Sequence, residues 1–250
     1  MIDLRGRSVL VTGGSRGIGA ACCRLLARAG ARVAVNYRVE RAGAERLAAE
    51  IRDGGGEAIV AGADVAQSAE VEALLEEVLA RFGRLDVLVN NAGIWTGAPI
   101  DELSDREWNE TVATNLTGTF HLIRAAVPSM KRHGGRIINV SSTAGQRGEA
   151  GHAHYAATKG AIISLTKSLA VELAPFGILT NCVAPGWVET DMTRSALAGD
   201  GRAAVLAGIP LGRAARADEI AGAVLFLASD LASFVNGEVL NVNGGAVLVG

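Results

Sequence analysis

The sequence predicts an α/β protein built on a doubly wound parallel sheet with helices on both faces. Short β-branched runs alternate with longer segments of helical period, which is the pattern of repeated βαβ units. The short runs are apolar without strict alternation, and strands of this kind are covered by helices on both sides. No linker, repeat or low-complexity stretch divides the 250 residues. We therefore expect one domain over residues 1–250.

Seven strands are expected, each a short run rich in branched apolar residues. In chain order they are Ser8–Thr12, Arg32–Asn36, Glu57–Ala61, Asp86–Asn90, Arg136–Ser141, Leu179–Ala184 and Val239–Val242. One helix follows the first strand to about Ala29, another runs from about Ala153 to Ala174, and a third begins near Ala217. The clearest helical face has the spacing of about 3.6 residues that one side of a helix requires. It consists of Val71, Leu74, Leu75, Val78, Leu79 and Phe82.

Composition and charge argue against several classes of protein. The 24 lysines and arginines are balanced by 26 aspartates and glutamates, so a nucleic-acid surface is not expected. The longest clear apolar run, Ile220–Ala228, has nine residues, well short of the ~18 that cross a membrane. No apolar block follows a basic start, so no secretory signal is expected.

The three cysteines point to a reducing compartment. Cys22, Cys23 and Cys182 have no metal-ligand spacing, and a sparse, odd number of cysteines is typical of proteins without disulfides. Cys22 and Cys23 lie early in the first helix, and we expect both side chains to have only a packing role. The expected location of the protein is therefore the cytoplasm.

One long segment departs from the alternation of strands and helices. About thirty residues separate the sixth strand from the helix near Ala217, and several of them are glycines. Long loops in compact domains are usually lids or binding loops, so we expect a substrate lid at about residues 187–212. A short surface helix with loose ends is the alternative for this segment.

A glycine-rich turn directly after the first strand predicts a nucleotide site. The turn reads Thr12-Gly-Gly-Ser-Arg-Gly-Ile-Gly19 and leads into a helix. A strand that turns through glycines into a helix lets backbone N–H groups meet a pyrophosphate at the positive end of the helix dipole. The spacing Gly-x-x-x-Gly-x-Gly differs from the more familiar Gly-x-Gly-x-x-Gly pattern. The position of the turn at the start of a βαβ unit favours the nucleotide interpretation.

The end of the second strand indicates which nucleotide is bound. Proteins that bind NAD place an acidic residue there for the ribose 2′-hydroxyl. This chain reads Asn36-Tyr37-Arg38, with no carboxylate before Glu40. Arg38 and Arg16 could converge on a 2′-phosphate, for which guanidinium groups are well suited. We therefore expect NADP(H), with two solvated arginines as the alternative interpretation.

Three side chains form a candidate catalytic group. Tyr155 and Lys159 are four residues apart in a helical segment, so both project from one face. An ammonium near a tyrosine favours the phenolate, and such a pair can transfer protons near neutral pH. Ser142 lies at the carboxyl end of a predicted strand, where parallel sheets present ligand contacts. Each residue type alone means little.

Together with other motifs, these residues resemble the short-chain dehydrogenase/reductase family over essentially the full chain. The matching pieces are Thr12-Gly-x-x-x-Gly-x-Gly19, Asp64-Val65, Asn90-Asn91-Ala92-Gly93, Asn115, Ser142, Tyr155-Ala-Ala-Thr-Lys159 and Pro185-Gly186. The resemblance implies a single-domain Rossmann fold and a catalytic tetrad. In this tetrad Tyr155 is the general acid/base and Ser142 orients the substrate carbonyl. Lys159 binds the nicotinamide ribose and lowers the pKa of the tyrosine, and Asn115 holds a relay water.

The same resemblance implies where NADP(H) lies. Asp64 and Val65 would contact the adenine, Asn91 would lie along the cofactor, and Val188 and Thr190 would approach the nicotinamide. The complete set expected to bind the cofactor is Gly13, Ser15, Arg16, Gly17, Ile18, Gly19, Tyr37, Arg38, Asp64, Val65, Asn91, Ala92, Gly93, Tyr155, Lys159, Pro185, Gly186, Val188 and Thr190.

Within the family, the chain looks most like the bacterial 3-oxoacyl carrier-protein reductases. The points of likeness are Val35-Asn36-Tyr37, Ala184-Pro-Gly-Trp-Val-Glu-Thr-Asp-Met192, Pro210-Leu-Gly-Arg213 and Gly237-Glu-Val-Leu-Asn-Val-Asn-Gly-Gly245. The resemblance implies NADPH-dependent reduction of 3-oxoacyl thioesters in fatty acid biosynthesis, with an acyl carrier protein as partner. One departure is Phe176, where several of these enzymes have a basic residue that helps to dock the carrier. Lys131, Arg132 and Arg136 are an alternative docking patch.

Two other functions remain open. The enzyme could instead act on small secondary alcohols, ketones or sugars, because relatives with such activities carry similar strings. A redox-sensing protein that keeps its nucleotide without catalysis is a further alternative, which the presence of all four tetrad residues argues against.

The expected substrate pocket is partly apolar. Residues that follow strand ends should line it, namely Ile94, Trp95, Ala144, Gln146, Glu149, His152, Trp187, Met192 and Leu197. Two tryptophans without a cationic clamp suit an apolar carbonyl compound better than a phosphorylated one. His152 and His154 have no further ligand at suitable spacing, so no metal is expected.

The helix that carries Tyr155 indicates self-association. One side of the helix has an apolar stripe, which consists of Ile162, Leu165, Leu169 and Leu173. Two further apolar residues, Ile163 and Val171, lie outside this stripe. A helix that is apolar on more than one side must be covered twice. The family resemblance implies a homotetramer.

Overall fold

The computed structural model describes residues 2–199 and 201–248, and in this part of the chain it contains one sheet of seven parallel strands. The order of the strands is β3-β2-β1-β4-β5-β6-β7. Their bounds are Ser8–Val11 (β1), Arg32–Tyr37 (β2), Glu57–Gly62 (β3), Val87–Asn90 (β4), Gly135–Val140 (β5), Ile178–Pro185 (β6) and Val239–Val242 (β7). Every predicted strand forms, with each end within one residue of its expected position. The doubly wound Rossmann topology is therefore confirmed.

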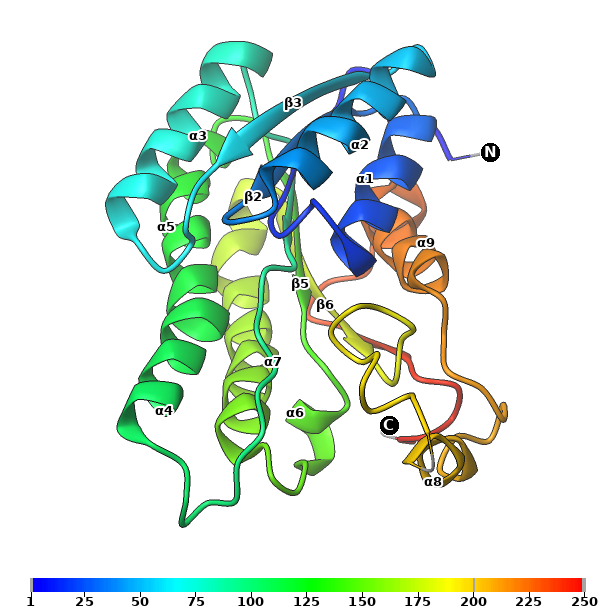
Figure 1. The fold of residues 1–250 in the computed structure, drawn as a ribbon. Helices are drawn as coiled ribbons and strands as arrows, with labels where there is room; N and C mark the ends of the chain where they lie inside the picture. Colours follow the sequence, from blue (N-terminus) through cyan, green and yellow to red (C-terminus); the bar gives the residue numbers. More distant parts are fainter. Residues whose placement is uncertain (1, 200, 249–250) are drawn as a thin grey trace.

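Helices cover both faces of this sheet (Figure 1). One face carries α1 (Gly17–Arg28), α2 (Arg41–Asp53) and α9 (Ala217–Ala228). The other carries α3 (Ser68–Phe82), α5 (Gly118–Met130) and α7 (Ala153–Leu173), with α4 (Asp105–Val112) packed beside α7. Two short helices, α6 (Ala144–Arg147) and α8 (Gly201–Ala207), lie in connections that follow β5 and β6.

The pleat of the strands divides the core into two layers. Val9 and Val11 pack toward α1, α2 and α9, whereas Leu10 between them packs toward α3 and α5. Successive side chains of a strand point to opposite faces, so a strand covered on both sides must be apolar throughout. Cys22 and Cys23 are fully buried in the first layer, as the sequence predicted.

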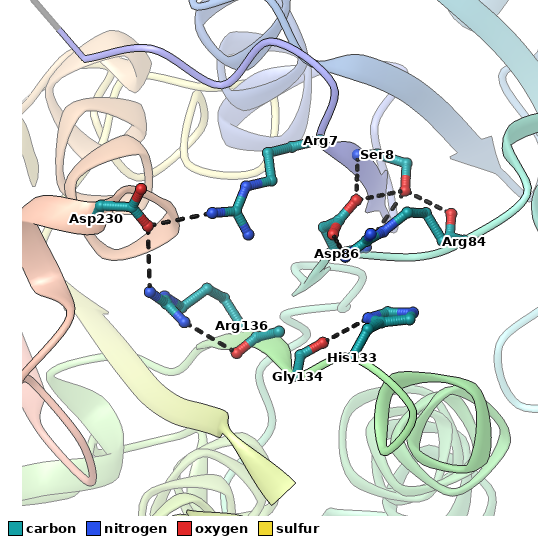
Figure 2. A network of polar contacts seen from close by, with 9 residues as sticks. Arg7, Ser8, Arg84, Asp86, His133, Gly134, Arg136 and Asp230 are labelled. Carbon is teal, nitrogen blue, oxygen red and sulfur yellow. Dashed lines mark hydrogen bonds and ion pairs between the residues drawn. The ribbon is translucent and has the colours of Figure 1, made fainter.

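A network of polar contacts lies at the amino-terminal ends of the strands, opposite their carboxyl ends (Figure 2). Asp86 is 1% exposed and accepts hydrogen bonds from the backbone N–H and the hydroxyl of Ser8 at 2.9 and 3.1 Å. Its carboxylate also pairs with Arg84 at 2.5 Å. Nearby, exposed Asp230 pairs with Arg7 at 3.2 Å and with Arg136 at 3.5 Å. This network joins the starts of β1, β4 and β5.

The segment expected to act as a lid contains a short helix. Residues 187–212 include a series of turns and α8. A short helix was expected under the alternative interpretation of this segment. Val188 is joined to Ala215 by an isolated bridge, which holds the start of the segment against the chain that leads into α9. None of the helices in residues 2–199 and 201–248 is long and apolar enough to cross a membrane.

Candidate active site

A cavity runs along the carboxyl ends of the strands. Most of the residues predicted to bind the cofactor line it, together with the catalytic candidates Ser142, Tyr155 and Lys159. The predicted cofactor residues in its wall are Gly13, Ser15, Arg16, Gly17, Ile18, Tyr37, Arg38, Asp64, Val65, Asn91, Ala92, Gly93, Tyr155, Lys159, Pro185, Gly186, Val188 and Thr190. Parallel strands bring these distant segments to one edge of the sheet, where the strand order reverses between β1 and β4.

The glycine-rich turn is shaped for close approach of a ligand. Gly13 has a φ of +61°, a conformation that residues with a Cβ rarely adopt. The backbone N–H of Gly14 donates to the Asn36 carbonyl at 2.7 Å, and the Asn91 amide donates to the Thr12 carbonyl at 2.9 Å. These bonds join the turn to β2 and to the loop after β4. The turn thus forms a cradle at the amino terminus of α1, which suits a pyrophosphate.

Gly19 does not line the cavity, contrary to the prediction. It is buried, and a Cβ at this position would lie 2.2 Å from the carbonyl oxygen of Gly13. The absence of a side chain therefore allows α1 to pack against the turn. Gly19 thus shapes the cradle, and its contact with the cofactor stays a prediction.

Two guanidinium groups lie at the adenosine end of the cavity. Arg16 and Arg38 both line it and are exposed, and Arg38 directly follows Tyr37, the last residue of β2. Arg38 is 3.6 Å from a carboxylate oxygen of Asp64, which keeps the guanidinium near the cavity wall. Arginine presents several N–H donors to a phosphate, so this end of the cavity fits a nucleotide with a 2′-phosphate.

Tyr155 and Lys159 lie in the first two turns of α7, and Ser142 is the second residue after β5. The Lys159 ammonium donates to the carbonyl oxygen of Val140, the last residue of β5, at 2.8 Å. It lies 5.6 Å from the centroid of the Tyr155 ring. The hydroxyl of Ser142 accepts a bond from the Ala144 N–H at 3.1 Å, which fixes its position at the start of α6.

Burial shifts the pKa values of both titratable groups. It raises the pKa of Tyr155 to about 12, an effect that hydrogen bonding with Ser142 opposes and the charge of Glu149 reinforces. It also lowers the pKa of Lys159 to about 8, because the low-dielectric surroundings disfavour the ammonium. Burial thus has a larger effect on the pKa of Tyr155 than the expected lowering by Lys159. The phenol is held in its protonated form near neutral pH.

Asn115 lies behind the cavity wall rather than in it. It is fully buried on a single π-helical turn, Ala113–Thr117, between α4 and α5, and such turns are frequent at functional sites. Its side chain accepts from the N–H of Ile94 at 2.8 Å and donates to the carbonyl of Ile94 at 3.0 Å. The structure therefore gives Asn115 a positioning role for the loop after β4. The relay water stays a prediction.

Six of the nine residues expected in the substrate pocket line the cavity. They are Ile94, Trp95, Ala144, Glu149, Trp187 and Met192. Gln146 instead donates to Asn241 at 2.6 Å, and Leu197 is only 7% exposed beneath the turns of its segment. His152 stacks behind Trp95, with ring centroids 4.4 Å apart and planes 4° from parallel.

Sequence reasoning missed several residues of this wall. Arg147 on α6, Thr114 on the π-helical turn and Asp191 on the segment after β6 all line the cavity. Arg147 thus adds a cation to the wall that the sequence analysis did not identify. A lone arginine on a four-residue helix has no periodicity or spacing that could have marked it. Within the described ranges, no group of three His, Cys, Asp or Glu side chains could hold a metal ion.

Comparisons with known proteins show the family of the chain. A family model described as enoyl-(acyl carrier protein) reductase matches residues 13–247. The chain is 45% identical to the 3-oxoacyl-(acyl-carrier-protein) reductase of Escherichia coli over 250 residues, which cover 99% of this chain and all of the relative. It is also 45% identical to the enzyme of the same name from Staphylococcus aureus, over 96% of this chain and 97% of the relative.

Two solved structures have the same fold. A dehydrogenase/reductase from Sinorhizobium meliloti aligns with a TM-score of 0.93 and 38% identity, over 98% of this chain and 97% of the other. A protein described as an NAD(P)-dependent gluconate 5-dehydrogenase from Beutenbergia cavernae, solved with bound NADP, aligns with a TM-score of 0.93 and 42% identity, over 98% of both chains. The chain belongs to the short-chain dehydrogenase/reductase family of oxidoreductases.

Proposed function

We propose that this protein is an NADPH-dependent reductase that converts 3-oxoacyl thioesters into 3-hydroxyacyl thioesters. The observation that carries this proposal is the arrangement of Tyr155, Ser142 and Lys159 in one cavity, whose wall also contains Trp95, Trp187 and Met192. A protonated phenol beside a serine hydroxyl suits the reduction of a carbonyl group, which must gain a proton. The names of the Escherichia coli and Staphylococcus aureus relatives support the choice of substrate.

The inner part of the cavity fits NADPH. The glycine-rich turn would hold the pyrophosphate, Arg16 and Arg38 the 2′-phosphate, Asp64 and Val65 the adenine, and Lys159 the nicotinamide ribose. When bound, NADPH supplies the hydride that adds to the carbonyl carbon. The NADP-bound Beutenbergia cavernae structure supports this choice of cofactor.

The side chains of the chain complete the reduction. Ser142 donates a hydrogen bond from its hydroxyl to the carbonyl oxygen and holds it beside Tyr155. Tyr155 donates its phenolic proton to the same oxygen, so that the carbonyl becomes an alcohol. The ammonium of Lys159 stabilises the phenolate that remains, because opposite charges attract strongly where water is excluded.

The proposal is tested by following NADPH consumption at 340 nm with a short 3-oxoacyl thioester. A panel of small ketones and NADH as the second cofactor serve as controls. Rapid, NADPH-specific reduction of the thioester is the expected result. Turnover of a ketone or alcohol without turnover of the thioester would instead place the protein among general carbonyl reductases.

That second function has observations in its favour. Phe176 occupies the place of a basic residue, and the ammonium of Lys131 lies over its ring at 4.1 Å from the centroid. Arg136 does not contribute to the expected docking patch, because its side chain is 13% exposed and bound to Asp230. The name of the Beutenbergia cavernae neighbour indicates a sugar acid as substrate for that protein. Oxidation of small alcohols or sugars is therefore our second candidate.

We also propose that an acyl carrier protein docks at Lys131 and Arg132, which are both exposed.

The segment 187–212 would act as the substrate lid of a single domain over residues 1–250, since Thr190, Asp191 and Met192 line the cavity.

A cytoplasmic location is supported by the cysteines. Cys22, Cys23 and Cys182 are buried and unpaired, as is typical of proteins in a reducing compartment.

A homotetramer is the assembly that we propose. Val171 on α7 is 80% exposed, and Phe234 after α9 is fully exposed, so each face of the sheet has an apolar side chain without cover from its own chain. Burial of such residues between subunits is favourable. A monomer in sedimentation experiments at micromolar concentration would contradict this assembly.

A further inference from the structure

Glu149 places a carboxylate on the substrate side of the cavity. It follows α6 in the connection between β5 and α7, and its side chain is 25% exposed. It lines the same cavity as Tyr155 and Trp187. One of its oxygens accepts a hydrogen bond from the indole N–H of Trp95 at 3.3 Å. The proton transfer described above does not use this carboxylate.

The carboxylate is held in place by two connected segments. The backbone N–H of His152 donates to the carbonyl of Glu149 at 3.1 Å, and the His152 ring stacks on Trp95. Gly97 packs so closely that a Cβ there would lie 2.6 Å from Nε2 of His152. The N–H of Ala98 also donates to the Gly151 carbonyl at 2.8 Å. The loop after β4 thus fixes the indole that binds Glu149.

Other charged side chains line the same cavity, among them Lys159, Arg147 and Asp191. Arg147 is exposed, and Asp191 is paired with Arg194. Nδ1 of His152 lies 4.0 Å from Glu149, on the side away from the cavity. Glu149 is the charged side chain that contributes to the raised pKa of Tyr155. Its negative charge is therefore felt where a substrate carbonyl would meet the phenol.

We infer that Glu149 determines specificity by excluding compounds with a negative charge next to the reacting carbonyl. A free 3-oxo acid carries a carboxylate two carbons from its ketone, and this anion would be repelled by Glu149. An ester or thioester of the same acid is neutral at that position and is admitted. This inference rests on the proposed function, because it assumes that the site reduces a carbonyl compound.

The test uses two compounds with the same carbon skeleton, ethyl 3-oxobutanoate and the 3-oxobutanoate anion. The ratio of their kcat/KM values is measured for the wild-type enzyme and for Glu149→Gln, which keeps an acceptor for the Trp95 N–H but removes the charge. We expect Glu149→Gln to raise the relative kcat/KM of the anion about fivefold, mainly through a lower KM, which is roughly the effect of one unit charge at about 4 Å in water.

Two further variants separate charge from other effects. Glu149→Asp keeps the charge and should retain the discrimination against the anion. Glu172→Gln removes the same charge from an exposed position near the other end of α7 and should leave the ratio of kcat/KM values unchanged. An unchanged ratio in Glu149→Gln, or an equal gain in Glu149→Asp, would overturn the inference.

A failure of the proposed function would be recognised separately. If the wild-type enzyme reduced neither these two compounds nor the 3-oxoacyl thioester, the reductase proposal would fail, but binding of both compounds could still be measured. Trp95 and Trp187 line the cavity, so quenching of tryptophan fluorescence reports on the two ligands. Preferential gain of anion binding in Glu149→Gln would support the inference, and equal binding changes for both compounds would contradict it.

Discussion

Replacement of Lys159 by methionine should stabilise the fold while it abolishes most of the activity. The Lys159 side chain is almost completely buried, at 4% exposure. Its pKa falls from an ordinary value of 10.5 to about 8 because burial disfavours the ammonium. Since one pKa unit corresponds to about 1.4 kcal/mol, burial of this charge costs about 3 kcal/mol near neutral pH. Loss of the bond to the Val140 carbonyl offsets about 1 kcal/mol of that gain.

The sign of the pH dependence follows from the direction of the shift. Between pH 8 and pH 10.5 the unfolded chain binds more protons at this lysine than the folded chain, so the stability of the wild-type protein rises with pH in that window. The methionine variant lacks this dependence. Its advantage of about 2 kcal/mol at pH 7 should therefore shrink to about zero at pH 10.

Urea denaturation of both proteins at pH 7 and at pH 10 measures this difference. Lys167→Met, at an exposed position on the same helix, is the matched control and should change the free energy of unfolding by less than about 0.5 kcal/mol. A Lys159→Met variant that is less stable than the wild type at pH 7 would refute the reasoning. A stability difference that is the same at both pH values would refute it as well.

Three further predictions concern catalysis, cofactor choice and the far edge of the sheet. Tyr155→Phe should keep cofactor binding in a fluorescence titration but lower the steady-state rate about a hundredfold or more, because it lacks the acidic proton. Unchanged turnover would contradict the role of Tyr155 as the general acid. Arg38→Ala should weaken binding of NADPH about tenfold while binding of NADH changes little. Arg41→Ala, at an exposed position outside the cavity, is the control. Tighter binding of NADH than of NADPH by the wild type would contradict the predicted cofactor preference. Asp86→Ala should lower the free energy of unfolding by about 3 kcal/mol, because it leaves the Ser8 donors and Arg84 unpaired. Asp230→Ala, at an exposed position, should lower it by less than about 1 kcal/mol. Equal losses of stability in urea denaturation would show that burial of Asp86 is not the cause of its effect.

The sequence by itself was sufficient for the architecture and for the chemical groups of the site. Hydrophobic runs such as the one around Val9, Leu10 and Val11 identify a strand because every position is covered by one helical layer or the other. The glycine-rich turn and the spacing of Tyr155 and Lys159 are local patterns, and local geometry places their parts together. The same holds for the arginine at the end of the second strand, which predicted the phosphate of NADP(H).

Only the tertiary structure decided which side chains share an environment. The tether between Trp95 and Glu149, the place of Arg147 in the wall and the withdrawal of Gln146, Leu197 and His152 from it depend on contacts between segments far apart in the chain. The direction of the pKa shift at Tyr155 was mispredicted for the same reason. The sequence puts an ammonium near the phenol, but the depth at which both groups are buried is set by the packing of α7 against β6 and by the hydrogen bond of Lys159 to the end of β5. Burial has the larger effect on the pKa values.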